Sequence, residues 1–214
     1  METKPKCKIC RRLGKKLFLK GDKCNSVKCP MTTKPYPPGI KGKRRLGGVS
    51  EYGRQLKEKQ KLKNWYSISE KQFKNYVIKV LEKSRQKTGK TINDQEAVIK
   101  ELETRLDNVI YRLGIAASRT KARQMVSHGH FFVNRKAVDI ASFQVKKGDK
   151  ITIRPSSLKK PVFKEISTTF KKVQPPLWLK TDVDKLEAEV IGYPTIDMAA
   201  PPAEIQTIFE FYSK

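Results

Sequence analysis

Two close pairs of cysteines constrain the start of this chain more than any other feature. Cys7 and Cys10 are spaced C-x2-C, Cys24 and Cys29 are spaced C-x4-C, and the chain has no other cysteine. Two short-spaced pairs bring four thiolates to one point with little backbone rearrangement, as tetrahedral zinc requires. We therefore predict a zinc knuckle with one Zn²⁺ per chain. With four protein ligands the site is closed, so the metal is structural and not catalytic.

Other interpretations of the cysteines stay open. Two disulfides would need an oxidising compartment, of which the sequence gives no sign. Four buried thiols without a metal would need apolar surroundings, but this 29-residue stretch carries eight lysines and two arginines. A redox C-x-x-C would need a thioredoxin-like strand and helix. An iron–sulfur cluster accepts the same four thiolates, and a basic tail without metal is the remaining alternative.

The charge of the chain indicates a polyanionic partner. Lys and Arg number 47 against 21 Asp and Glu in 214 residues, a net charge of +26. Such an excess repels itself in a compact free protein, so binding to nucleic acid is its natural explanation. Residues 1–63 carry net +16, residues 64–179 net +14 and residues 180–214 net −4. We expect the first two segments to face the polyanion and the last to face protein or solvent.

The composition argues against a membrane protein. The hydrophobic fraction is 37%, and no run of 18 apolar residues occurs. The first 16 residues, METKPKCKICRRLGKK, contain no apolar stretch of signal-peptide length. We therefore expect a cytoplasmic protein without a membrane partner.

The segment 32–48, TTKPYPPGIKGKRRLGG, cannot form a regular helix or strand because of its prolines. It is either a flexible linker or an extended arm on phosphates. We favour the arm, because a tether does not need four cations. The candidate RNA contacts here are Lys41, Lys43, Arg44 and Arg45, with Tyr36 available to stack on a base or ribose.

Helical patterns follow the arm, and strand patterns follow the helices. Residues 51–63 and 69–85 are predicted helices, the second with Ser69 as its N-cap. Residues 102–113 and 118–127 predict two helices joined by a tight turn. FFVNRKAVDI and QVKKGDKITIRP then alternate as strands do. The predicted fold class is α+β: a mainly helical domain with an N-terminal zinc knuckle, and a small inserted module of two helices and an antiparallel sheet.

Several segments together resemble one known family. Behind the cysteine pairs, SEYGRQLKEKQKLK, RLDNVIYRLG, SRTKARQMVSHGH and VKKGDKI are similar to bacterial small-subunit ribosomal protein four. KLFLKGDKC and YPPGIKGKRR match it too. The chain departs from the family in its opening METKPK, and in having Asn134 followed by Arg135 where the family's hairpin has Asn-Gly. Arginine adopts φ > 0 less easily than glycine, so the turn type is in question.

The resemblance implies a structural, RNA-binding protein of the small ribosomal subunit. It implies direct binding to small-subunit ribosomal RNA early in assembly of the subunit body, a place beside ribosomal proteins three and five at the mRNA entrance, and an influence on decoding accuracy. Some members also bind their own mRNA. No small-molecule substrate or catalysis is implied.

Candidate RNA contacts of the module combine cations with hydrogen-bonding side chains. Arginine binds phosphate at two points, and glutamine or histidine can reach ribose hydroxyls. The candidates are Arg105, Arg112, Arg119, Lys121, Arg123, Gln124, His128 and His130. Asp107 is expected to orient a neighbouring arginine.

We divide the chain into four parts: residues 1–48 (knuckle and arm), 49–102 (helical domain), 103–165 (RNA-binding module) and 166–214 (a C-terminal segment packing back on the helical domain). The sequence also offers two alternative functions. An RNA-modifying enzyme using the same module would need a catalytic domain, for which the remaining residues leave no room. A zinc-containing DNA-binding regulator would prefer duplex DNA to structured RNA.

Overall fold

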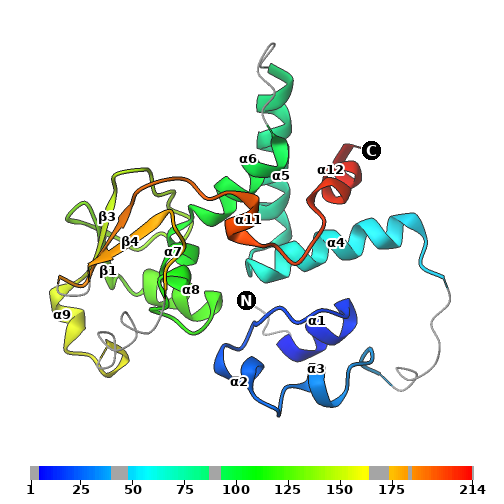
Figure 1. The fold of residues 1–214 in the computed structure, drawn as a ribbon, viewed down its shortest axis with the longest axis horizontal. Helices are drawn as coiled ribbons and strands as arrows, with labels where there is room; N and C mark the ends of the chain where they lie inside the picture. The colour runs from blue at the N-terminus through cyan, green and yellow to red at the C-terminus, as the bar shows by residue number, and fades with distance from the viewer. Residues whose placement is uncertain (1–4, 40–47, 87–92, 164–173, 183–184, 214) are drawn as a thin grey trace. The chain divides into compact units, whose positions relative to one another are not determined.

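The structure, a computed structural model, describes residues 5–39, 48–86, 93–163, 174–182 and 185–213 (Figure 1). The chain forms two compact units. Unit 1 comprises Met1–Gln95 and Ala200–Lys214, and unit 2 comprises Glu96–Ala199. Its mixture of helices and a small antiparallel sheet confirms the predicted α+β class. In the part of the chain that the structure describes, no helix is both long and apolar enough to span a membrane.

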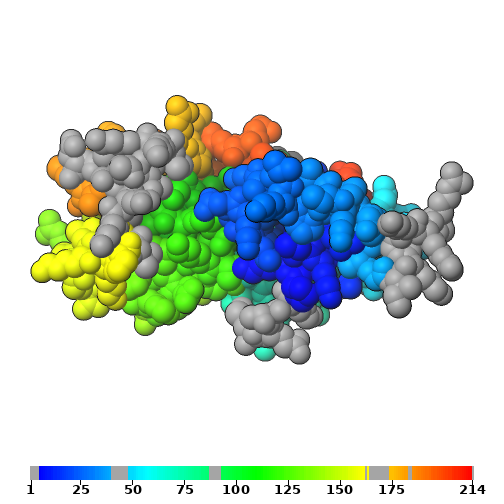
Figure 2. Space-filling view, turned by 90° about the horizontal axis from the view of Figure 1, so that it is seen from below, coloured from blue at the N-terminus to red at the C-terminus, as the bar shows by residue number. Residues whose placement is uncertain are grey.

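The start of unit 1 is a small helical body, which we call the N-terminal lobe (residues 5–39). It contains α1 (Lys6–Leu13), α2 (Asp22–Asn25) and α3 (Pro30–Thr33). Helix α1 ends at Gly14, whose φ of 70° is the left-handed cap conformation that glycine adopts without strain. Cys10, Leu17 and Leu19 form the core of the lobe, and Trp65 packs against them. Figure 2 shows the lobe, in blue, as a continuous body of surface atoms.

Two longer helices follow close to the predicted positions. Helix α4 spans Glu51–Trp65, and the Ser50 hydroxyl accepts a hydrogen bond from the Gly53 N–H at 3.2 Å. Helix α5 spans Glu70–Gln86 and buries Phe73, Val77 and Val80. The Ser69 hydroxyl accepts from the Gln72 N–H at 3.3 Å, which confirms Ser69 as the cap.

The last helix, α12 (Ile205–Ser213), packs on α4 within the same unit. The rings of Tyr52 and Phe211 lie 5.6 Å apart, and the Lys59 ammonium lies 4.3 Å from the Phe211 ring centre. Lys59 also pairs with Glu70 of α5 at 2.6 Å. The last helix of the chain therefore packs on the first long helix of unit 1, and this confirms the prediction that the final residues pack on the N-terminal helical part.

Unit 2 begins within α6 (Asp94–Glu103) and continues with α7 (Leu106–Arg112) and α8 (Arg119–Ser127). The predicted continuous helix over 102–113 is wrong, because the chain is extended at Arg105 (φ −66°, ψ 136°). Arg105 forms an isolated bridge with Gln144, and the Thr104 carbonyl accepts from the Val145 N–H at 2.9 Å. Pairing with residues far along the chain thus interrupts the helix at this point.

The sheet of unit 2 is antiparallel, with strand order β2-β1-β3-β5-β4. The strands are β1 (Phe131–Val133), β2 (Lys136–Val138), β3 (Lys150–Ile153), β4 (Leu179–Asp182) and β5 (Glu187–Val190). Asn134 and Arg135 join β1 to β2 with φ of 50° and 65°. Positive φ at both central residues is the type I′ pattern, so this chain keeps the tight hairpin turn with arginine in place of glycine.

The core of unit 2 lies between the helices and one face of the sheet. Val109 and Ile110 of α7 meet Ala122 and Val126 of α8, and Phe131 comes from β1. The short elements α9 (Pro155–Leu158), η1 (Pro161–Phe163) and α11 (Ile196–Ala199) complete the unit.

The C-terminal segment is divided differently from the prediction. The four-part division places residues 166–214 on the helical domain, but β4 and β5 extend the sheet of unit 2, and only residues from Ala200 onward belong to unit 1. Trp178, predicted to anchor this segment, is 3% exposed and buried in the core of unit 2. The boundary between units falls at 95/96 instead of 102/103.

Candidate nucleic-acid interface

Asp107 organises one half of a buried ionic cluster in unit 2. Its carboxylate accepts from the Arg105 guanidinium at 3.0 and 2.8 Å and from the Arg123 Nε at 2.9 Å. Because Asp107 is 2% exposed, these charges interact in a medium that water screens weakly. The expectation that Asp107 orients a neighbouring arginine is confirmed, and its carboxylate orients both Arg105 and Arg123.

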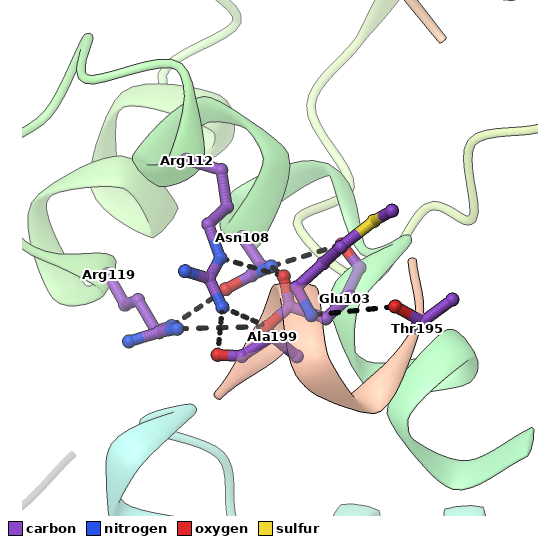
Figure 3. Close-up of polar contacts among 7 residues, drawn as sticks. Glu103, Asn108, Arg112, Arg119, Thr195 and Ala199 are labelled. Carbon is purple, nitrogen blue, oxygen red and sulfur yellow. Dashed lines mark hydrogen bonds and ion pairs between the residues drawn. The ribbon is translucent and has the colours of Figure 1, made fainter. Parts of the chain in front are cut away.

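Glu103, at the end of α6, organises the other half (Figure 3). Arg112 donates to its two carboxylate oxygens at 2.8 and 2.7 Å, and Asn108 donates at 2.7 Å. The Arg119 guanidinium lies 3.9 Å from Glu103 and donates through Nε to the side-chain amide oxygen (Oδ1) of Asn108 at 2.7 Å. Arg112 also donates to the carbonyl of Ala199 at 2.8 Å, which ties α11 to α7.

This cluster changes the interpretation of several predicted RNA contacts. Arg105, Arg119 and His130 are buried, with exposed fractions of 2%, 5% and 6%. Arg112 and Arg123 are half-buried and bound to Glu103 and Asp107. In this structure the four arginines bind the carboxylates of Glu103 and Asp107, and His130 contacts Ser157. These contacts give the five side chains a positioning role within unit 2, and their predicted contact with RNA stays a prediction.

The remaining candidates of the module form one exposed stripe. Lys121, Gln124 and His128 are exposed, and their spacing of three and four residues places them on one side of α8 and its C-cap. Helix α8 is held by Ser118, whose hydroxyl accepts from the Lys121 N–H at 3.3 Å. We call these three side chains the α8 stripe.

The two histidines have different environments. His128 is exposed, whereas the His130 ring is buried with its Nδ1 2.9 Å from the Ser157 hydroxyl and its centre 5.4 Å from that of Phe163. Burial lowers the pKa of His130, and the charges of Lys160, His128 and Arg154 lower it further. The structure therefore favours a neutral His130, which acts as a packing group in this unit.

The four predicted zinc ligands line one small pocket in the N-terminal lobe. All four are free thiols; Cys10, Cys24 and Cys29 are buried, and Cys7 is half-buried. Burial raises the pKa of Cys10, an N–H of the Leu17 backbone offsets part of this rise, and the other three cysteines add to it. Across the described residues, no group of three or more His, Cys, Asp and Glu side chains is arranged as a metal-binding set. The zinc site thus stays a prediction.

The predicted arm is described only at its beginning. Lys41, Lys43, Arg44 and Arg45 lie outside the described residues. Tyr36 is half-buried beneath Arg11, whose guanidinium carbon lies 4.9 Å from the ring centre and whose Nε donates to the Tyr36 carbonyl at 2.9 Å. The arginine occupies the ring that was predicted to stack on RNA, so one face of Tyr36 is already used.

Sequence reasoning missed Glu103 as a cluster centre. The signal was present, because Glu103 and Asp107 are spaced i, i+4 among four arginines. A second missed residue is Phe18, which is exposed between two buried leucines and has a positive φ.

Comparison with known proteins agrees with the resemblance. Residues 2–95 match the family described as ribosomal protein S4/S9 N-terminal domain, and residues 104–151 match the S4 domain. The small ribosomal subunit protein uS4 of Halothermothrix orenii is 46% identical over 98% of this chain and 97% of its own length. The uS4 proteins of Caldicellulosiruptor saccharolyticus and Thermotoga petrophila are 46% and 42% identical over 98% and 99% of this chain, and over 97% and 98% of their own lengths.

These relatives are described as ribosomal proteins and not as enzymes, in agreement with the predicted absence of catalysis. The matches to both domains, in the same order and over nearly the whole length, show that the chain belongs to the uS4 family of small ribosomal subunit proteins.

Proposed function

We propose that this chain is a structural component of the small ribosomal subunit that binds small-subunit ribosomal RNA directly. The observation that carries the proposal is the α8 stripe, an exposed line of Lys121, Gln124 and His128 in a protein of net charge +26. Folded RNA is recognised mainly through its shape, phosphates and ribose hydroxyls. A lysine supplies a charge for phosphate, and glutamine and histidine supply hydrogen bonds for ribose.

The salt dependence of binding to in-vitro-transcribed small-subunit ribosomal RNA tests this proposal. Each phosphate contact releases condensed counterions, so log K should fall steeply with log salt. Lys121→Gln should weaken binding and reduce the salt slope by about 1. Lys185→Gln is the matched control, because Lys185 is also exposed but belongs to the acidic C-terminal segment. Affinity that does not change between low and high salt would contradict the proposal.

We extend the proposal to the role of the protein in the ribosome. Membership of the uS4 family supports early binding that nucleates assembly of the subunit body, and a cytoplasmic location. It also supports contact with ribosomal proteins three and five, a contribution to the mRNA entrance and decoding accuracy, and binding to the protein's own mRNA. Reconstitution of the subunit with this protein omitted should block addition of later body proteins. Unimpaired addition would contradict the assembly role.

We also propose that Cys7, Cys10, Cys24 and Cys29 hold one structural Zn²⁺. Support comes from the donor set, since four thiols line one pocket and no other ligand is needed. The Lys20 N–H lies 3.4 Å from the Cys24 sulfur, and such donors stabilise thiolates. Lys6, Lys16 and Lys20 line the same pocket and would offset the charge of a zinc tetrathiolate.

Metal analysis of protein purified without chelator tests the zinc site. We expect about one zinc per chain, and a lower zinc content with reduced thermal stability of unit 1 for Cys24→Ser. Iron with visible absorbance would indicate an iron–sulfur cluster instead. Protein without any metal would contradict both.

A further inference from the structure

Phe18 in the N-terminal lobe has an unusual backbone and an unusual exposure. Its φ is 52°, in the left-handed region that a bulky side chain adopts only with strain. Its side chain is 42% exposed, whereas those of Leu17 and Leu19 on either side are 1% and 6% exposed. The strained conformation thus turns an aromatic ring outward between two core residues.

The surrounding contacts hold this conformation in place. Leu17 and Leu19 are buried in the core of the lobe with Cys10, and the Lys20 N–H donates to the Cys24 sulfur at 3.4 Å. The carbonyl of Phe18 accepts a 3.5 Å hydrogen bond from the Gly21 N–H. The backbone is therefore tied to the lobe on both sides of Phe18. Strain that the surroundings enforce in this way indicates a functional position.

The charge around the ring indicates what it binds. The Lys16 ammonium lies 5.4 Å from the ring centre, and Lys15 and Lys20 are exposed nearby in the chain. Asp22 is the only carboxylate between residues 5 and 39. An exposed aromatic ring in cationic surroundings suits a nucleotide, because a base stacks on the ring while lysines attract its phosphates. A basic setting of this kind fits a nucleic acid better than an apolar protein surface.

We propose that Phe18 is a stacking platform for an unpaired base of the ribosomal RNA, with Lys16 close enough to contact the adjoining phosphate. This inference rests on the proposed RNA binding and names a contact in the N-terminal lobe that is separate from the residues of the α8 stripe. It assigns a role in recognition to a residue that contributes no charge.

The backbone of Phe18 provides variants that separate stacking from folding. Phe18→Gly removes the ring and relieves the strain, because glycine adopts positive φ freely. Its thermal stability should equal or exceed that of the wild-type protein, while its RNA affinity falls. Phe18→Leu removes the aromatic face but keeps an apolar side chain, and Phe18→Trp keeps a stacking surface.

The affinity of each full-length variant for in-vitro-transcribed small-subunit ribosomal RNA tests the proposal. Loss of one stacked base corresponds to a decrease of about fivefold to 150-fold for Phe18→Gly and Phe18→Leu. Phe18→Trp should bind as tightly as the wild-type protein. The salt slope of Phe18→Leu should not change, because no phosphate contact is lost.

Tyr193→Leu is the matched control. Tyr193 is 43% exposed and has the Lys100 ammonium 3.4 Å from its ring centre, but it lies in the segment of net negative charge. Its replacement should not change RNA affinity. If the wild-type protein binds with steep salt dependence and Phe18→Leu binds equally well, stacking is refuted and the proposed function stands. If the wild-type protein itself shows no salt-dependent binding, the proposed function fails first.

Discussion

Replacement of Glu103 tests whether the buried ionic cluster holds unit 2 together. Glu103→Ala removes a carboxylate with 1% side-chain exposure that accepts two hydrogen bonds from Arg112 and one from Asn108. A hydrogen bond to a charged group contributes about 1.5–3 kcal/mol, so the two from Arg112 together give about 3–6 kcal/mol. Breaking a buried ion pair costs about 3–5 kcal/mol, which overlaps that range.

The exposure of Arg112, the ion-pair partner of Glu103, decides where in this range the loss of unfolding free energy falls. The Arg112 side chain is 17% exposed and keeps its hydrogen bond to the Ala199 carbonyl, so it regains some water when Glu103 is lost. Asn108 and Arg119 are buried and regain little. We therefore expect Glu103→Ala to lower the free energy of unfolding of unit 2 by about 3–4 kcal/mol, in the lower part of the range.

Denaturant unfolding followed by tryptophan fluorescence measures this loss. Trp178 is 3% exposed and reports on unit 2, and a Trp65→Phe background removes the signal of unit 1. The control is Lys185→Ala, which lies in the same unit and whose 72% exposed side chain pairs with Asp182 at 4.0 Å. An exposed pair of this kind contributes about 0–1 kcal/mol.

A double-mutant cycle with Arg112→Ala then isolates the pair, and we expect a coupling free energy of about 1–3 kcal/mol. A loss for Glu103→Ala no larger than that of the Lys185 control, or a coupling near zero, would refute the reasoning.

Three further predictions follow from other groups. Asp107→Asn should destabilise unit 2 by about 2–4 kcal/mol, because two arginines then lose their buried counter-charge; an unchanged Trp178 unfolding midpoint would contradict this. Burial alone would raise the pKa of Glu70, but its two lysine partners lower it overall. Glu70 therefore stabilises unit 1 above its ordinary pKa of 4.5, and this contribution should be lost as pH falls further; Glu70→Gln should remove that pH dependence of the unfolding free energy. Burial lowers the pKa of His130, so below pH 6.5 the unfolded chain binds a proton at this residue more readily than the folded unit does. The free energy of unfolding of unit 2 should therefore decrease as the pH is lowered below 6.5. An equal decrease in the His130→Gln variant would contradict this.

Local patterns predicted the helices well because each is set by residues close in sequence. The apolar spacing of Phe73, Val77 and Val80 identified α5, and Ser69 marked its start. The same holds for α8, whose buried Ala122 and exposed Lys121 follow from helical periodicity. In these elements, the partner that buries the apolar face need not be known for the helix to be recognised.

Features that depend on distant partners were missed. The break at Arg105 is caused by pairing with Gln144, nearly 40 residues away, which local propensity does not contain. In β5 the half-buried Glu187 and Glu189 alternate with the buried Ala188 and Val190, so the segment is only weakly apolar and its sequence did not identify it as a strand. Its place in the sheet depends on long-range pairing with β3, which the sequence does not reveal directly.

The cations were the hardest residues to interpret, since one residue type has two roles in this chain. An arginine near a carboxylate is buried and positions helices, whereas a lysine without one stays in water and can meet phosphate. In the cluster of unit 2, four guanidinium groups, two of them from α8, face the carboxylates of Glu103 and Asp107, which leaves a net charge of +2 in the cluster. Charges in a weakly screened interior act over longer distances than charges in water. Under the proposed function, these charges add to the positive potential that attracts RNA to the α8 stripe. Replacing Arg105 with an apolar residue of similar size, in a variant that keeps its fold, should therefore weaken binding to small-subunit ribosomal RNA.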